Sequence, residues 1–179
     1  MEINVKKIAA DLGVILGVML FILNAVFYIV DIELFLNPMV SLYSLFFVIA
    51  FGCYSIINSR KKLGGYINWS DAFVSYMVCI AIGMAISALT QTFIFLILDP
   101  VATEKLNEMS LIMIKETYSS MGVNEELLQQ VLIEAEKNPS FSFKNITLGL
   151  AVVLLMHVII GAICALITLI FNRNNPEIA

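Results

Sequence analysis

Charged residues are scarce in this chain. Asp, Glu, Lys and Arg together make up 13% of its 179 residues, whereas hydrophobic residues make up 60%, and the mean hydropathy is +0.94. An ordinary globular domain carries about 25% charged residues. The composition therefore excludes a typical soluble domain and predicts an integral membrane protein.

Basic residues, histidine and cysteine are also few. Ten Lys and Arg stand against fourteen Asp and Glu, and no basic patch is large enough to predict a nucleic-acid partner. The three cysteines, Cys53, Cys79 and Cys164, fall at a similar depth in apolar runs that contain no histidine near that depth. Free cysteine commonly behaves as a small buried hydrophobe. We therefore expect no metal, no disulfide and no cofactor.

Four long apolar runs dominate the sequence. A helix needs about 20 apolar residues to cross a hydrocarbon core of roughly 30 Å, and in lipid a helix satisfies its own backbone hydrogen bonds. The qualifying runs span residues 8–30, 39–58, 72–98 and 146–171. We predict an all-α fold, a four-helix transmembrane bundle that forms a single integral membrane domain over residues 1–179. The first run is expected to be a retained signal-anchor, because it is too long for a cleaved signal peptide.

Basic residues near the ends of the runs predict the orientation. Lys6 and Lys7 precede the first run, residues 60–62 (Arg-Lys-Lys) follow the second, and Arg173 follows the fourth. All of them lie on one side of the membrane if the spans alternate. Because cytoplasmic loops are enriched in Lys and Arg, we expect both termini in the cytoplasm and the loop 99–145 outside.

The loop between the third and fourth runs has a helical pattern of its own. Asp99-Pro100 ends the third span, since a residue before proline disfavours helical geometry. Apolar residues then recur at helical spacing on both sides of Gly122. Asn124 is suited to cap a second helix, and Asn138-Pro139 ends it. The sequence thus predicts an extramembrane amphipathic helical hairpin over about residues 100–138.

Three roles are open for this hairpin. Its helices can pack on each other, lie in the headgroup region over the bundle, or offer a docking face to a partner protein. The candidate docking residues are Leu106, Met109 and Met113. The acidic faces argue against binding to anionic lipid, because peripheral helices that bind it are rich in Lys and Arg. The expected partners are the lipid bilayer and either a protein partner or further copies of the chain.

Small residues share a face in several runs. Gly13 and Gly17 form a Gly-xxx-Gly pair in the first run, and Gly161 and Ala165 lie one helical turn apart in the fourth. Small residues allow the backbones of membrane helices to approach closely. We expect these faces to pack within the bundle, with homodimerisation through one of them as the alternative.

Polar residues inside the spans are candidates for function. At about 1.5 Å of rise per residue, Asn24, Gln91 and His157 lie roughly 9, 10 and 16 Å from the outer ends of their spans. They could form one polar cluster for a small solute or a proton, in which His157 is the group that titrates near neutral pH. Alternatively, the three side chains only bond to one another as interhelical ties. No carboxylate shares their depth, and catalysis needs a nucleophile beside a base or a set of metal ligands, so we expect no enzyme activity.

Taken in order, these features resemble a bacterial family. The stretch GGYINWSDAF before the third span, the Asp99-Pro100 exit, the EKLNEM helix, the Gly122 break and the Asn138-Pro139 re-entry are similar to the four-span membrane family catalogued as domain of unknown function 4199. In that family a Gly-Gly-x-Ile-x-aromatic turn precedes an Ala-Phe helix start. The matching positions are Gly64, Gly65, Ile67, Ala72 and Phe73, while Trp69 stands where Phe is expected. The resemblance covers nearly the whole chain; it implies a four-span fold and a bacterial inner-membrane address, and no activity or catalytic residues.

The sequence therefore favours a non-enzymatic accessory or interaction protein of the bacterial cytoplasmic membrane. The alternative is a small transporter or channel subunit that uses Asn24, Gln91 and His157. Four spans leave little room for a solute and no inverted repeat is visible, so such a subunit would need to oligomerise.

Overall fold

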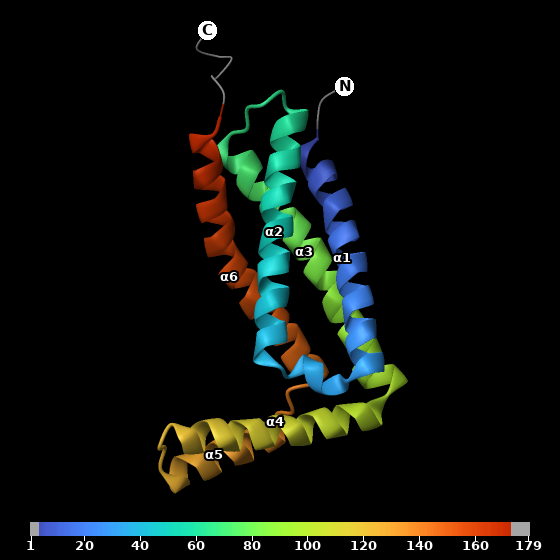
Figure 1. Ribbon diagram of the computed structural model, residues 1–179, viewed down its shortest axis with the longest axis vertical. Coiled ribbons are helices and arrows are strands. Elements are labelled where there is room, and N and C mark those ends of the chain that lie inside the picture. The colour runs from blue at the N-terminus through green and yellow to red at the C-terminus, as the bar shows by residue number, and fades with distance from the viewer. Residues whose placement is uncertain (1–3, 173–179) are drawn as a thin grey trace.

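The computed structural model describes residues 4–172, and every regular element within that range is a helix (Figure 1). Four helices are long and apolar enough to cross a membrane: α1 (Val5–Val30), α2 (Pro38–Lys62), α3 (Trp69–Phe93) with its π-helical extension η2 (Ile94–Leu98), and α6 (Phe143–Ile170). A short 3-10 helix, η1 (Ile32–Phe35), joins α1 to α2. The predicted all-α fold with four spans is confirmed.

The spans begin earlier than the apolar runs indicate, because polar caps lie outside those runs. The side chains of Asn4, Asn37, Asn68 and Ser142 accept hydrogen bonds from the first turns of α1, α2, α3 and α6 respectively. Such caps satisfy backbone N–H groups that the helix itself leaves unpaired. Hydropathy thus locates the part of each helix suited to lipid, while the capping residue sets where the helix starts.

The predicted hairpin is present as α4 (Pro100–Ser120) and α5 (Glu125–Lys137). Gly122, at φ +70°, supplies the left-handed turn between them, and Asn124 caps α5 by accepting from the Leu127 N–H at 2.9 Å. In Figure 1 the hairpin lies across one end of the bundle and extends past α6. The hairpin is therefore an arm placed transverse to the spans.

Helix α3 is the centre of the bundle and packs against α1, α2 and α6. Its buried residues Tyr76, Cys79 and Ile80 belong to one apolar core with residues of the other three spans. Three fully buried serines join α2 to α3: Ser75 Oγ lies 2.9 Å from Ser55 Oγ and 2.8 Å from Ser59 Oγ. Hydroxyl pairs of this kind tie helices together where no water is available.

A second, smaller core joins the hairpin to the outer end of the bundle. Phe95 and Leu106 are fully buried there. The ring of Phe95 makes edge-to-face contacts with the rings of Phe35 and Phe141, at centroid distances of 4.9 and 5.1 Å. The Thr103 hydroxyl donates to the carbonyl oxygen of Phe95. We call this contact between η2, η1, the start of α4 and the segment before α6 the joint.

Asp99 ties the joint to the first span. Its Oδ1 accepts from the Ala102 backbone N–H and its Oδ2 from the Tyr28 hydroxyl, each at 2.9 Å. These two hydrogen bonds, the Ala102 bond first, hold the pKa of the Asp99 carboxyl below its usual range.

The joint is therefore expected to weaken in acid. Because the folded-state pKa of Asp99 is lowered, its stabilising effect is fully present above the unfolded value of about 3.9 and is lost as the pH falls through the folded value. In Tyr28→Phe one of the two donors is gone, so the Asp99 titration should move toward higher pH. The Ala102 amide resonance, followed by NMR between pH 2 and 6, measures that midpoint; an unchanged midpoint would contradict the role of Tyr28.

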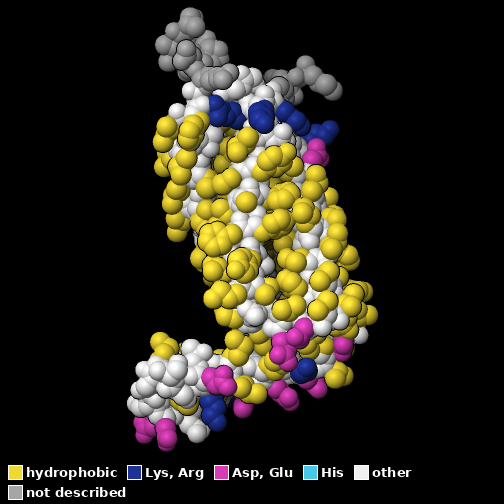
Figure 2. All heavy atoms as spheres, in the orientation of Figure 1, with side chains coloured by type: hydrophobic (Ala, Val, Ile, Leu, Met, Phe, Trp, Pro, Cys, Tyr) yellow, Lys and Arg dark blue, Asp and Glu magenta, His cyan; other side chains and the backbone are white. Residues whose placement is uncertain are grey.

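Charge separates along the long axis of the molecule. Figure 2 shows most of the visible Lys and Arg at the end near both termini, most of the visible Asp and Glu at the hairpin end, and a hydrophobic belt between. Within the described residues the basic end includes Lys6, Lys7 and residues 60–62, whereas Arg173 lies outside them. At the same end, the Arg60 guanidinium donates to the carbonyl oxygens of Gly65 and Phe171.

Candidate functional site

Asn24 reaches the central helix from α1. Its side chain is buried, and its Nδ2 donates to the hydroxyl oxygen of Ser87 on α3 at 3.0 Å. Gln91 lies one turn further along α3 on the same side as Ser87, and both residues line the same cavity. The polar residues of α1 and α3 are therefore side by side in the outer half of the bundle.

His157 is held by Tyr76. Both side chains are fully buried, and the Tyr76 hydroxyl lies 2.9 Å from Nδ1 of His157. Two glycines make room for the Tyr76 ring. A Cβ added at Gly161 would lie 2.6 Å from Cδ1 of Tyr76, and a Cβ added at Gly52 would clash with the opposite edge of the ring, at Cδ2 and Cε2. The second ring nitrogen, Nε2, is buried and has no hydrogen-bond partner in the described part of the chain.

These polar residues line one cavity of about 370 Å³ between α1, α2, α3 and α6. We call it the outer cavity. Asn24, Gln91 and His157 all contribute to its wall, together with Ser87 and two serines of α2. The remaining lining residues are aliphatic, aromatic or Met side chains. The three residues singled out in the sequence thus converge on one space.

The hydrogen bonds differ from the direct ties that the sequence suggested as an alternative. No hydrogen bond joins any two of Asn24, Gln91 and His157 in the described structure; Ser87 and Tyr76 are the partners instead. Ser87 could have been found from its i, i+4 spacing to Gln91. Tyr76 has no comparable signal, because its contact with α6 depends on how the helices cross.

The hairpin face requires a correction. Leu106 is fully buried in the joint among Ile94, Phe95 and Phe141, so it is not available to a partner. Met109 is half-buried, and Met113 has 39% of its surface exposed. Only the part of the predicted docking face beyond the joint is free.

The small residues lie at contacts within the chain. A Cβ at Gly13 would lie 2.8 Å from the backbone oxygen of Cys79, and one at Gly17 would lie 2.8 Å from Cβ of Ile86, both on α3. Gly161 faces Tyr76, and Ala165 is fully buried in the main core. These faces are occupied by α3 and are not free for a second copy.

The cysteines are placed across two helices. Cys53 Sγ of α2 lies 3.4 Å from Cys164 Sγ of α6, and Cys79 is buried nearby in α3; all three are free thiols. Within residues 4–172 no group of three or more His, Cys, Asp or Glu side chains is arranged to hold a metal ion. The contact therefore joins α2 and α6 near the end of the bundle that carries the termini.

Comparison with known proteins gives the family. No curated protein and no solved structure matches the chain. A family model described as "Protein of unknown function (DUF4199)" matches residues 11–174, which include the hairpin, three of the candidate spans in full and the first span from residue 11 onward. The chain therefore belongs to the DUF4199 family, as its motifs indicated.

Proposed function

We propose that this protein is a non-enzymatic accessory protein of the bacterial cytoplasmic membrane, with both termini in the cytoplasm and the hairpin outside. The orientation is supported by the basic end of the bundle, since Lys and Arg are retained on the cytoplasmic side. A non-enzymatic role is supported by His157, whose Nδ1 is bonded to a tyrosine and not to a nucleophile–acid pair.

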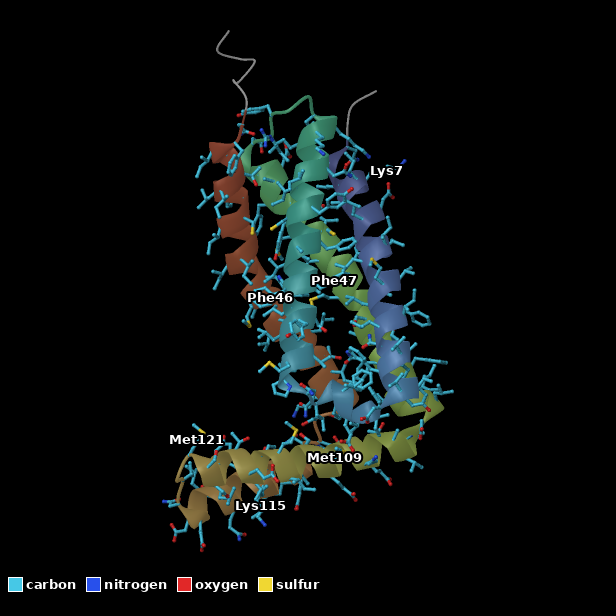
Figure 3. All side chains as sticks on the ribbon, viewed as in Figure 1. Lys7, Phe46, Phe47, Met109, Lys115 and Met121 are labelled. Carbon is cyan, nitrogen blue, oxygen red and sulfur yellow. The ribbon has the colours of Figure 1, made fainter. Side chains whose placement is uncertain are left out.

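The observation that carries this proposal is the continuous apolar face of α4. Leu106 packs into the joint, and Met109 and Met113 follow it at i+3 and i+7, which places them on the same side of the helix. The hairpin extends past α6 (Figure 1), and Met109 lies on the side of α4 that is turned toward the spans (Figure 3). In a membrane, this side of the outer part of the hairpin would face the bilayer beside the bundle. Lys115 lies on the opposite side.

This geometry favours a partner that is itself embedded in the membrane. A soluble protein approaching from outside meets the charged side of the hairpin, which carries Glu104, Glu108 and Lys115. A second membrane protein, placed beside α6, would meet Met109 and Met113 at the outer ends of its own spans. We therefore propose such a protein as the occupant of this face.

The test is native mass spectrometry of the protein extracted in lipid nanodiscs from its host membrane. Wild type and the Lys115→Ser control should retain one membrane protein at fixed stoichiometry, and the double variant Met109→Ser/Met113→Ser should lose at least nine-tenths of it. The helical content of all three, measured by circular dichroism, should be equal because neither methionine is in a core. If a photo-crosslinker at Met113 labels only phospholipid, the hairpin rests on the bilayer and the proposal fails.

A second candidate function is supported by the outer cavity. Asn24, Gln91 and His157 line one space inside the bundle, as a subunit that handles a small molecule would require. We propose ligand binding, as the first step of transport or sensing, as this alternative.

A further inference from the structure

The outer cavity is large enough for a small molecule. Its volume of about 370 Å³ lies within the range of roughly 300 to 1,000 Å³ found for ligand sites. A specific ligand for this cavity rests on the second candidate function and not on the hairpin, so either can fail without the other.

The residues that line the outer cavity disfavour a charged ligand. Among residues 4–172, no Asp, Glu, Lys or Arg lines it, and apolar side chains such as Leu45, Val48 and Met84 make up most of the surface. A charged ligand at this depth would lack a counter-charge, and desolvating it would cost several kcal/mol. The wall therefore fits an uncharged and mainly apolar molecule.

The unpaired nitrogen of His157 adds a specific polar contact. His157 is among the residues that line the cavity while Tyr76 is not, and Nε2 lies on the side of the ring away from the Nδ1 atom that meets Tyr76. If the Tyr76 hydroxyl donates to Nδ1, only the Nε2–H group remains unpaired. The reverse arrangement leaves both the Tyr76 hydrogen and the Nε2 lone pair unpaired, which costs more. The Nε2–H group therefore requires a hydrogen-bond acceptor.

The depth of His157 restricts the kind of acceptor. His157 lies fourteen residues from Phe143 at the outer end of α6, which is roughly 21 Å along the helix and close to its middle. The carbonyl groups of phospholipids are held near the membrane surface by their headgroups, roughly 15 Å from the centre of a 30 Å core. The acceptor must then belong to a molecule that dissolves in the hydrocarbon core.

The packing of α2 and α6 provides an entrance. The two helices meet through Cys53 and Cys164 in the half near the termini. In the outer half, Ser44 of α2 and Met156 of α6 border the cavity instead, and Met156 is 51% exposed. A molecule dissolved in the membrane can reach the cavity from this side.

We propose that the outer cavity binds an uncharged, mainly apolar molecule with a carbonyl oxygen, taken from the surrounding membrane, and that His157 Nε2–H donates a hydrogen bond to that oxygen. Asn24 and Gln91 offer amide groups to a second polar atom of the same molecule. An isoprenoid quinone has this chemistry.

Because His157 is the only histidine, its ring can be observed directly. The full chain, made with 15N-histidine and purified through a tag without histidine, is placed in nanodiscs of ether-linked phosphatidylcholine, which has no ester carbonyl. Decylubiquinone is the probe. We expect its addition to shift the Nε2 resonance in a saturable manner, while Nδ1 keeps the signature of its bond to Tyr76.

Two tryptophan variants on neighbouring positions of α2 complete the test. Ser44→Trp fills the part of the cavity beside Ser44, about two helical turns along α2 from Gly52, which faces Tyr76, and should reduce the Nε2 shift at least tenfold. Tyr43→Trp is the control, because Tyr43 is 71% exposed and does not line the cavity, and it should keep the shift. No Nε2 shift at saturating decylubiquinone, or an equal shift in Ser44→Trp, overturns the proposal. A change of Nε2 between ether-linked and ester-linked lipid without the quinone would assign the carbonyl to phospholipid and overturn it as well.

Discussion

Gly13→Val is expected to lower the midpoint of thermal unfolding by about 2 to 12 °C, from an overpacking cost of roughly 1 to 3 kcal/mol in a chain of this size. A Cβ at this position would lie 2.8 Å from the backbone oxygen of Cys79 and 2.9 Å from Cβ of Ile82. The carbonyl belongs to α3, the helix on which the other spans pack, so it cannot move without moving the centre of the bundle.

Gly149→Val is the matched control for this prediction. Gly149 is also within a spanning helix, α6, but a Cβ there would meet no atom within 4 Å. The intrinsic change from glycine to valine is then the same in both variants, and only the contact differs. Unfolding in nanodiscs, followed by circular dichroism, gives both midpoints. Equal midpoints would mean that α1 and α3 do not approach as closely as described.

The comparison of Gly13 with Gly149 also shows what the sequence could and could not predict. Residue type alone makes the two positions equivalent, and only the helix crossing separates them. The four spans and the hairpin were predictable because each follows from local patterns: long apolar runs, Asp99-Pro100, Gly122 and the Asn124 cap. The starts of the spans were less predictable, since caps such as Asn68 lie outside the apolar runs.

The outer cavity was partly predictable. The depths of Asn24, Gln91 and His157, counted along the helices, placed them at comparable levels, and they do line one space. Depth does not specify rotation about the helix axis, and rotation decides hydrogen-bond partners. For that reason His157 is bonded to Tyr76 and Asn24 to Ser87, and no hydrogen bond joins His157 to Asn24 within the described residues.

Sequence spacing also could not show that Leu106 is buried and not available for docking. Its spacing to Met109 and Met113 correctly placed the three residues on one face of α4, but spacing along a helix does not show where the neighbouring structure ends. The joint covers the first turns of α4 and leaves the later ones free. One face therefore has two environments, a buried one at Leu106 and an exposed one at Met113.

Leu106→Ala is accordingly expected to release the hairpin from the bundle. Leu106 is fully buried in the joint at the outer end of the bundle, and removing a buried leucine side chain costs about 2 to 5 kcal/mol. Amide hydrogen exchange of the α4 peptides, measured by mass spectrometry in nanodiscs, should accelerate about thirtyfold or more, since 1.4 kcal/mol corresponds to a factor of ten. Exchange in α1, α2 and α6 should stay the same.

Met113→Ala isolates the effect of the joint from the effect of a shorter side chain. Met113 is on the same face of the same helix but 39% exposed, so its truncation removes few contacts and should leave α4 exchange within about twofold of wild type. If both variants exchange alike, the joint does not hold the arm in place. The arm would then be free to pivot about Pro100, and the methionine face could not present a fixed surface to a neighbouring membrane protein. A large difference between the two variants would instead mean that the arm is held rigidly, so that Met109 and Met113 keep a constant position beside α6, as a specific partner requires.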